Sequence, residues 1–219
     1  MINIALDGPA GSGKSTVAKM IAKKLDILYL DTGAMYRACA LKCLKSGVSV
    51  KDESAVEPII SNIDLKIEYK NGSQVTVLDG EDVSLDIRRP EISMMASDVS
   101  ALKCVRLKMV EMQRLIAKNM NCILDGRDIG SFVLPDAEYK FFVTADSKVR
   151  AERRYKELIE RGNAVEFESL HKEILQRDYN DSHRDFAPLK QADDAIVIDT
   201  SAMTAEEVCE KIMSYIGRK

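Results

Sequence analysis

The 219-residue sequence has few of the residue types that serve as zinc ligands or covalent nucleophiles. It has only two histidines, His171 and His183, and its five cysteines include one closely spaced pair, Cys39 and Cys43. A tetrahedral zinc site would need a second such pair, which the sequence lacks. The odd number of cysteines also disfavours a disulfide scaffold. We therefore interpret the cysteines as buried reduced thiols, and no histidine or cysteine stands out as a catalytic nucleophile.

The sequence also lacks a basic excess and long apolar runs. The formal net charge is -3, although 32 lysines and arginines leave room for local basic clusters. A sequence-independent nucleic-acid binder normally has a net positive charge, so we expect no nucleic-acid partner. No apolar run approaches the roughly 20 residues that span a bilayer, and no basic segment precedes Asp7. These absences predict a soluble, cytoplasmic protein with no membrane partner, and a monomer is our default expectation.

Short apolar, β-branched runs alternate with helical periodicity along the chain. This pattern is typical of a parallel sheet flanked by helices, so we predict an α/β fold with three layers and five parallel strands. The predicted strands are residues 2–7, 27–30, 122–125, 139–143 and 195–199. The clearest helices are residues 14–25, 34–44, 99–118, 148–160, 167–182 and 205–216. Thr204 and Glu207 have the spacing of a capping box at the start of the last helix.

Residues 64–84, with the sequence DLKIEYKNGSQVTVLDGEDVS, interrupt this alternation of strands and helices. Apolar and polar residues alternate around the segments KNGS and LDGE, which are typical of tight turns between antiparallel strands. We predict three short antiparallel strands here, as a small β insertion between helices of the core.

The stretch GPAGSGKST follows the first predicted strand and has the full spacing of a phosphate-binding loop. Its glycines let the backbone curl so that N–H groups surround phosphate oxygens. Lys14 would supply a positive charge to the β- and γ-phosphates, and the Ser15 hydroxyl would bind Mg²⁺. A glycine-rich turn before a helix would explain the glycines but not the Lys-Ser pair. We predict that a nucleoside triphosphate is bound by Gly8, Pro9, Ala10, Gly11, Ser12, Gly13, Lys14, Ser15 and Thr16.

A loop of this kind is equally compatible with GTPases, motor ATPases and small-molecule kinases. The sequence has no Asn-Lys-x-Asp segment for guanine recognition, and its loops and helix ends hold more arginines than a water-attacking NTPase needs. The planar guanidinium grips phosphate bidentately, so these arginines suit a second anionic substrate. The sequence therefore favours a kinase whose acceptor is itself phosphorylated.

Two further loops, DTGAMYR and DGRDIG, also begin where predicted strands end, at the sheet edge where open α/β folds bind ligands. The second loop places Arg127 between two aspartates, for which a structural ion pair is a fair alternative. The first supplies a hydroxyl, an aromatic ring and a fixed cation suited to a nucleoside monophosphate, although its tyrosine could instead belong to the core: Thr32, Tyr36 and Arg37.

Two predicted helices hold clusters of arginines. The stretch RDYNDSHR has Arg177, Asp181 and Arg184 at intervals of four and three, which places them on one helical face. An exposed salt-bridge ladder would give the same spacing and contribute little stability. The stretch RAERRYKELIERG has a default interpretation as a solvated helix face, and its arginines are Arg150, Arg153, Arg154 and Arg161.

Five stretches, in this order and with the β insertion between the second and third, resemble the bacterial cytidylate kinases: DGPAGSGKST, LDTGAMYR, MASDVSALKCVR, LDGRDIG and RDYNDSHRDFAPL. The resemblance covers nearly the whole chain. It implies a P-loop NTPase-type fold and phosphoryl transfer from ATP to CMP or dCMP, with Mg²⁺ as cofactor. It further implies one domain, 1–219, with a core (1–32, 98–147 and 186–219), a nucleoside-monophosphate-binding region (about 33–97) and a helical lid (about 148–185).

The resemblance also implies roles for individual residues toward CMP. Cytosine presents an amino donor beside two acceptors, so an acid and an arginine can recognise it together, while uracil would set a carbonyl against the acid. Tyr36 would pack against the base or the sugar. The implied contacts are Thr32, Arg177 and Asp181 to the sugar, Arg37, Arg127 and Arg184 to the phosphate, and Ser97, Arg106 and Asp128 to cytosine.

The arginine-rich stretch RAERRYKELIERG follows the fourth predicted strand, and in this position it resembles the arginine-bearing lid of nucleoside monophosphate kinases. We predict that Arg153 and Arg154 act on the transferring phosphoryl group together with Lys14 and Arg127. Kinases for UMP, AMP, dTMP or shikimate remain alternatives. A protein of another class, which binds nucleotides without catalysis and holds RNA through its arginines, is the more distant alternative.

Overall fold

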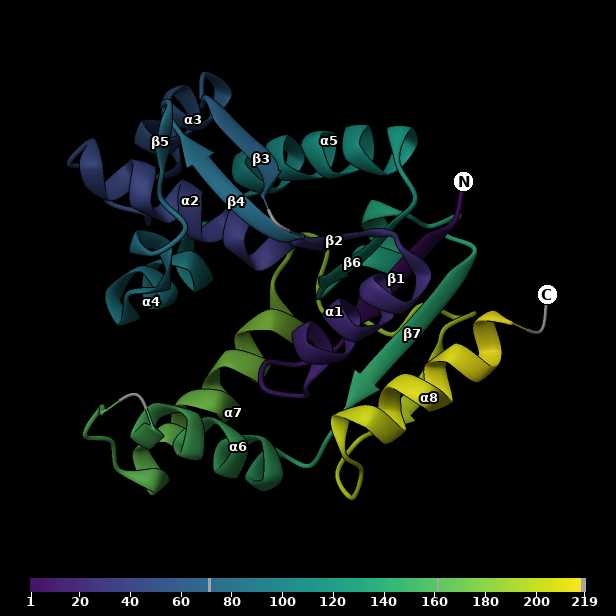
Figure 1. Cartoon of the computed structure of the whole chain (residues 1–219). Helices are drawn as coiled ribbons and strands as arrows, with labels where there is room; N and C mark the ends of the chain where they lie inside the picture. Colours follow the sequence, from purple (N-terminus) through teal and green to yellow (C-terminus); the bar gives the residue numbers. More distant parts are fainter. Residues whose placement is uncertain (71, 161, 218–219) are drawn as a thin grey trace. The chain divides into compact units, whose positions relative to one another are not determined.

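A computed structural model describes residues 1–70, 72–160 and 162–217 of the chain (Figure 1). Asn71, in the predicted KNGS turn, and Arg161, in the predicted lid, lie outside these described residues. The predicted five-stranded parallel sheet is confirmed, with the strand order β2-β6-β1-β7-β8. Each strand lies within one residue of its predicted bounds: β1 Asn3–Asp7, β2 Leu28–Asp31, β6 Cys122–Gly126, β7 Tyr139–Thr144 and β8 Ile196–Asp199.

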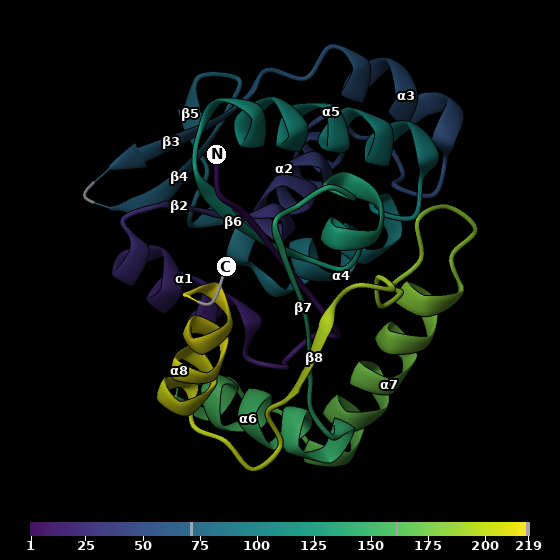
Figure 2. The same cartoon turned by 90° about the vertical axis from the view of Figure 1, so that its right-hand side faces the viewer.

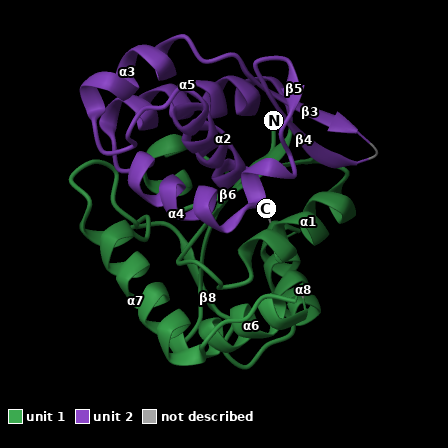
Figure 3. Ribbon diagram, turned by 90° about the vertical axis from the view of Figure 1, so that its left-hand side faces the viewer, with its two compact units in different colours: residues 1–29, 121–219 green, residues 30–120 purple. Residues whose placement is uncertain are grey.

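The chain divides into two compact units (Figure 3). Unit 1 comprises Met1–Tyr29 and Asn121–Lys219, and unit 2 comprises Leu30–Met120. Besides strands, unit 1 contains α1 Lys14–Leu25, the π-helical turn η2 Ile129–Val133, α6 Ser147–Glu160, α7 Phe167–His183 and α8 Ala205–Ile216. Unit 2 contains α2 Thr32–Lys45, α3 Glu53–Ser61, β3 Leu65–Lys70, β4 Ser73–Leu78, β5 Glu81–Asp82, the 3-10 turn η1 Asp86–Arg88, α4 Pro90–Val99 and α5 Lys103–Asn119.

In unit 1, α1 and α8 lie side by side and share a core with the sheet (Figure 2). Ile4 of β1, Ile21 of α1 and Ile212 of α8 are all fully buried in this core. Burying each such side chain contributes roughly 1.5–3 kcal/mol. The predicted capping box at the start of α8 is confirmed, because the side chains of Thr204 and Glu207 each accept the other residue's N–H.

In unit 2, the predicted β insertion is confirmed as the antiparallel sheet β3-β4-β5. Leu65 of β3 lies opposite Leu78 of β4, and Val77 of β4 lies opposite Asp82 of β5. In the turn LDGE, φ is 51° at Asp79 and 82° at Gly80. Two successive residues in this left-handed region are what a tight hairpin turn requires, and aspartate and glycine adopt it most readily.

The predicted helix over residues 99–118 is wrong at its start, because one helix ends and another begins in this region. α4 ends at Val99 and α5 begins at Lys103. The Ser100 hydroxyl donates to the carbonyl of Ser97 at 2.9 Å, and Nη1 of Arg106 donates to the carbonyl of Ser100 at 3.1 Å. These bonds satisfy carbonyl groups at the end of α4, so the chain can leave the helix before α5 begins.

Two helices, α3 and α4, are not predicted from the sequence, and each contains a proline. Pro58 lies inside α3, where proline is disfavoured, and Pro90 is the first residue of α4, where it is common. All five cysteines are free thiols, and all but the half-buried Cys104 are buried. Within the described ranges, the helices include none with both the length and the apolar character to cross a membrane.

Candidate active site

The donor loop, residues 8–16, runs from the end of β1 into the first turn of α1, and its glycines adopt positive φ angles. φ is 144° at Gly8, 76° at Gly11 and 87° at Gly13. A Cβ at Gly8 would stand 2.0 Å from the carbonyl oxygen of Val143, so a side chain there would collide with β7. Gly13 is the N-cap of α1, and no side chain among the described residues caps this helix. The first N–H groups of α1 therefore suit an anion.

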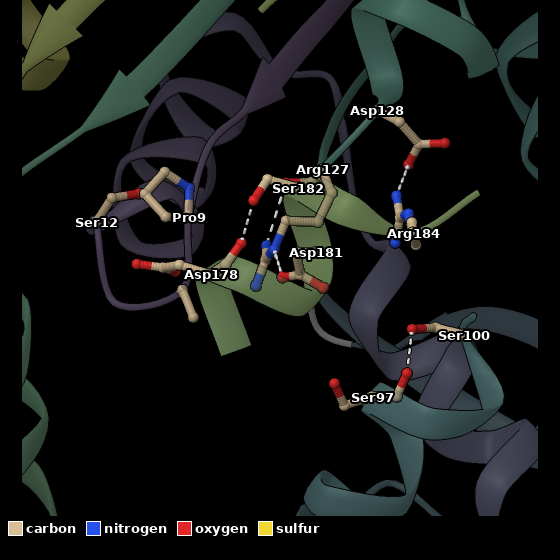
Figure 4. Close-up of polar contacts among 12 residues, drawn as sticks. Pro9, Ser12, Ser97, Ser100, Arg127, Asp128, Asp178, Asp181, Ser182 and Arg184 are labelled. Atoms are coloured by element: carbon tan, nitrogen blue, oxygen red, sulfur yellow. Dashed lines mark hydrogen bonds and ion pairs between the residues drawn. The ribbon is translucent and has the colours of Figure 1, made fainter. Parts of the chain in front are cut away.

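Lys14 is the buried cation of the donor loop. Its Nζ donates to the carbonyl oxygen of Pro9 at 2.7 Å and to the hydroxyl of Ser12 at 3.2 Å, so the ammonium lies within the curl of the loop (Pro9 and Ser12 in Figure 4). Burial, and then the positive charge of Arg127, lower the pKa of Lys14 to about 7. A phosphate placed beside this ammonium would stabilise its charge.

Ser15 and Asp125 provide adjacent oxygen atoms at the start of α1 and in β6. The Ser15 hydroxyl donates to Oδ2 of Asp125, and the hydroxyl of Tyr29 donates to Oδ1 at 3.3 Å. Mg²⁺ at a nucleotide site commonly takes one or two protein oxygens together with phosphate oxygens, and this pair fits that donor set. The described residues include no cluster of three or more His, Cys, Asp or Glu that could hold a metal. Of these two possible Mg²⁺ ligands, the sequence predicts Ser15 but not Asp125. The sequence feature that could have indicated Asp125 is an acidic residue at the end of a buried apolar run.

Asp7, the last residue of β1, is a buried carboxylate directly before the donor loop. It accepts the N–H groups of Ile129 and Gly130, each at 2.7 Å. Burial raises the pKa of Asp7 to about 6, although these two hydrogen bonds lower it, and the nearby charge of Asp128 raises it further.

The raised pKa of Asp7 predicts a pH dependence of folding. Between about pH 4, near the ordinary pKa of 3.8, and about pH 6, Asp7 keeps its proton in the folded protein but has released it in the unfolded chain. Asp7 therefore favours folding at low pH, and this advantage is lost as the pH rises through about 6. Relative to Asp7→Asn, the wild type should lose on the order of 2 to 3 kcal/mol of unfolding free energy between about pH 4 and pH 7. Urea unfolding across this range measures the difference, and a difference independent of pH would contradict the raised pKa.

In unit 1, predicted acceptor residues form two ion pairs (Figure 4). Nε of Arg127 donates to Oδ2 of Asp181 at 2.8 Å, and Nη2 of Arg184 lies 3.5 Å from Oδ1 of Asp128. Desolvation raises the pKa of Asp181, but the positive charges of Arg127, Arg177 and Arg184 outweigh it and hold that pKa below its usual range. The structure thus brings these five residues into one electrostatic network.

Arg184 does not share a helical face with Arg177 and Asp181, although their spacing predicts it. α7 ends at His183, and Arg184 follows it with φ -67° and ψ 145°, an extended conformation. Nε of Arg184 donates to the carbonyl of Ala187 at 2.7 Å. This hydrogen bond stabilises a turn after the helix. The guanidinium of Arg184 is therefore positioned by the loop that follows α7 and not by α7 itself.

In unit 2, Arg37 is held at the start of α2 by Asp31. Nη2 of Arg37 donates to Oδ2 of Asp31 at 2.9 Å, and Oδ1 accepts the N–H of Ala34 at 2.9 Å as the cap of the helix. A Cβ at Gly33 would lie 3.2 Å from Nη1 of Arg37, so glycine leaves room for this pair. Nε of Arg37 is buried without a hydrogen bond to the described residues, which leaves a donor for an anion. Thr32, the first residue of α2, is 3% exposed.

Tyr36, Ser97 and Arg106 are linked within unit 2. The guanidinium carbon of Arg106 lies 5.3 Å from the ring centroid of Tyr36, the geometry of a cation–π contact. Arg106 is 1% exposed, and its bond to the carbonyl of Ser100 brings it to the end of α4, where Ser97 lies. The hydrogen bond between Ser97 and Ser100 appears in Figure 4. Unit 2 therefore brings together three of the residues predicted to contact CMP. Within this group, the ring of Tyr36 packs on the guanidinium of Arg106.

Arg150 of α6 is buried, although sequence reasoning favours a solvated face for this arginine run. It is 4% exposed, and its guanidinium donates to the carbonyl of Ala145 at 2.9 Å and to that of Ala10 in the donor loop at 3.0 Å. It also binds both carboxylate oxygens of Asp178 in α7, at 3.1 and 2.5 Å. Arg150 is not among the residues predicted to act, because the spacing of residues along the chain does not indicate its contact with the donor loop.

Arg153 and Arg154, the two predicted catalytic residues of α6, differ in their contacts. Arg153 donates to the hydroxyl and the carbonyl of Thr200 at 3.0 and 2.6 Å, and that hydroxyl donates to the carbonyl of Ser12 in the donor loop at 3.2 Å. Arg154 pairs with Glu157 at 2.7 Å, with side chains 40% and 41% exposed. Arg153 thus reaches the donor loop through Thr200, while Arg154 lies at the surface of unit 1.

These contacts predict unequal effects of substitution on stability. Arg150→Met leaves the carboxylate of Asp178 uncompensated, and breaking a buried ion pair costs about 3 kcal/mol or more of unfolding free energy. The two side chains are 5% and 22% exposed. Arg154→Met is the matched control on the same helix, and losing an exposed pair should cost less than about 1 kcal/mol. Chemical denaturation measures both values, and equal losses would contradict the structural role of Arg150.

The chain matches the family model of cytidylate kinase over residues 4–218. Two relatives named cytidylate kinase are about half identical to it. The protein of Caldicellulosiruptor saccharolyticus is 52% identical over 212 residues, which are 97% of this chain and 94% of the relative. The protein of Clostridioides difficile is 51% identical over 214 residues, which are 98% of this chain and 97% of the relative.

Solved structures resemble the chain at much lower identity. An uncharacterized protein from Eubacterium ventriosum has a TM-score of 0.55 and 14% identity, with all of both chains covered. Shikimate kinase from Bacteroides thetaiotaomicron has a TM-score of 0.52 and 13% identity, over 99% of this chain and 98% of the other. At these identities the likeness shows the fold alone.

Proposed function

The chain belongs to the cytidylate kinase family and phosphorylates CMP with ATP as donor, and from this premise we propose the residues that act and dCMP as a second acceptor. The family resemblance read from the five sequence stretches is confirmed. We further propose one kinase domain with the nucleoside-monophosphate-binding region at about 33–97 and the lid at about 148–185. The protein would act in the cytoplasm as a monomer, with nucleotides rather than nucleic acid as partners.

The observation that supports the donor half is the buried Lys14 within a glycine loop at the uncapped start of α1. N–H groups of residues 8–16 would surround the phosphates of ATP, and Lys14 would exchange its carbonyl partner for the β- and γ-phosphate oxygens. Ser15 and Asp125 would hold Mg²⁺. When bound, this ion supplies positive charge that polarises the phosphoryl oxygens.

The acceptor half is supported by the networks that each unit holds. In unit 2, Arg37 has a buried Nε donor for the phosphate of CMP, and Thr32 and Tyr36 would contact the nucleoside. In unit 1, Arg127 and Arg184 would bind the phosphate, exchanging part of their pairing with aspartates for it. Arg177 and Asp181 would hold the sugar, and cytosine would be read by Ser97, Arg106 and Asp128.

The proposed reaction is an in-line attack by a phosphate oxygen of CMP on the γ-phosphorus of ATP. The new P–O bond forms as the bond to the β–γ bridging oxygen breaks, which gives CDP and ADP. The attacking oxygen is already anionic at neutral pH, so no general base is required. Lys14 and Arg127 would stabilise the charge of the transferring group, with Arg153 and Arg154 from the lid. Closure of the lid would exclude water that could otherwise hydrolyse ATP.

Formation of ADP from Mg·ATP in the presence of single acceptors tests this proposal. The acceptors are CMP, dCMP, UMP, AMP, dTMP, shikimate and none. We expect fast turnover with CMP and dCMP, slow turnover with UMP and almost none without an acceptor. Preference for another acceptor would retain the donor loop but refute the cytosine assignments. No acceptor-dependent turnover, together with a steep salt-dependent affinity for RNA, would instead support a binding protein.

A further inference from the structure

One buried acid of unit 1 has no part in the proposed reaction. Asp7 is 4% exposed and ends β1 immediately before Gly8. Each of its carboxylate oxygens accepts one backbone N–H, from Ile129 and from Gly130, at 2.7 Å. Hydrogen bonds to a charged acceptor are stronger than neutral ones, and losing either would leave a buried N–H unsatisfied. Asp7 therefore fixes the backbone of a segment more than a hundred residues away.

The segment that Asp7 holds begins with the base-reading acid. Ile129 opens the π-helical turn η2, and Asp128 is its N-cap. The carbonyl of Asp128 accepts from Phe132 at 2.9 Å and from Val133 at 3.0 Å. The first N–H groups of a helical turn have no partner within the turn, and here the carboxylate of Asp7 supplies it from another strand. The backbone that directly follows the Asp128 side chain is thus held by hydrogen bonds at the Asp128 carbonyl and at the next two N–H groups.

Gly130 shows how closely the two segments approach. A Cβ at Gly130 would lie 3.2 Å from Cδ of Lys140 and 3.4 Å from Oδ2 of Asp7. Even the smallest side chain would press on the stem of Lys140 and would lie in van der Waals contact with the carboxylate of Asp7. Glycine at this position therefore leaves room for the Lys140 stem beside the carboxylate of Asp7.

We propose that Asp7 is a positioning residue for cytosine recognition: by binding the N–H groups of Ile129 and Gly130, it sets Asp128 where its carboxylate can accept the 4-amino group of cytosine. This inference rests on the role of Asp128 under the proposed function. Because Asp7 also precedes Gly8 directly, one side chain links the start of the donor loop to the acid that reads the base.

Three variants test this proposal through the ratio of kcat/KM for CMP to kcat/KM for UMP. Asp7→Asn keeps the shape of the side chain but can accept only one of the two N–H groups, and it should lower the ratio about tenfold. Asp128→Asn should lower it at least as much. Asp52→Asn is the matched control, because Asp52 also accepts a backbone N–H, from Ala55 at 3.2 Å at the start of α3, and its ratio should not change.

The ratio separates positioning from stability, because a loss of folded protein lowers turnover of both substrates equally. An unchanged ratio in Asp128→Asn would refute the proposed role of Asp128, and the present inference with it. A lowered ratio in Asp128→Asn together with an unchanged ratio in folded Asp7→Asn would refute the role of Asp7 alone.

A second variant and a direct measurement keep the test decisive if Asp7→Asn fails to fold. Gly130→Ala crowds the stem of Lys140, which Pro135 and Asp194 hold in place, and should therefore shift η2 slightly away from Asp7. It should lower the same ratio by about threefold, the effect of a weakened rather than a lost hydrogen bond. Hydrogen exchange at the Ile129 and Gly130 amides should be slow in the wild type and faster in Gly130→Ala. An unchanged ratio with faster exchange would overturn the proposal.

Discussion

Replacing Lys14 by methionine should lower kcat about 10³-fold, because the loop then lacks the positive charge that faces the β- and γ-phosphates. Methionine has nearly the length of the lysine stem, so the curl of the donor loop should survive. The affinity for CMP should stay within about twofold, since Lys14 belongs to the donor half. Steady-state kinetics with CMP, and calorimetric titration of CMP, measure the two effects.

The same substitution should not destabilise the fold. Burial lowers the pKa of Lys14 to about 7, which means that the folded protein holds its ammonium at a cost. An apolar side chain removes that cost together with the hydrogen bonds to Pro9 and Ser12, so the two effects oppose each other and the melting temperature of Lys14→Met should stay close to that of the wild type. Lys23→Met, at an exposed position in the last turn of the same helix, is the control and should leave kcat unchanged. A kcat within tenfold of the wild type in Lys14→Met would remove Lys14 from the mechanism.

Arg37→Ala should lower kcat/KM for CMP about 10³-fold while leaving the affinity for ATP nearly intact. Alanine removes the guanidinium, including the buried Nε donor that lacks a partner among the described residues. The loss of stability should be modest, because the side chain of Asp31 retains its hydrogen bond to Ala34. Kinetics at saturating ATP and equilibrium titration of ATP separate the two halves of the site.

The control for Arg37 is an arginine of the same unit that lies at the surface. Arg89 pairs with Asp86, and their side chains are 53% and 42% exposed. Arg89→Ala should therefore turn over CMP at the wild-type rate. Normal turnover by Arg37→Ala would show that this arginine does not hold the acceptor phosphate.

Features that depend on neighbouring residues could be predicted from the sequence. The strands of the five-stranded sheet are short, mainly apolar runs, and α8 begins at a capping box that two side chains three residues apart define. Part of the donor loop is equally local, because Gly11 and Gly13 are required by the positive φ angles of one continuous stretch. Such features need no knowledge of what the rest of the chain brings near them.

Features that depend on distant segments could not be predicted in this way. Asp125 meets Ser15 from 110 residues away, and Arg150 meets the carbonyl of Ala10 from 140 residues away. The end of α4 depends instead on side-chain hydrogen bonds within six residues, from Ser100 to Ser97 and from Arg106 to Ser100, which the spacing of apolar residues does not indicate. Periodicity alone gives no sign of such contacts, so the buried partners of the donor loop appear only in the folded chain.

In the proposed mechanism the protein supplies position and charge, and the phosphoryl group passes directly from ATP to CMP without bonding to a side chain. The configuration of the phosphorus tests this claim most directly. With ATP made chiral at the γ-phosphorus by oxygen isotopes, a single in-line transfer should give CDP with inverted configuration at that phosphorus. Retention of configuration would indicate two successive transfers through a phosphorylated residue of the protein, and it would contradict the mechanism.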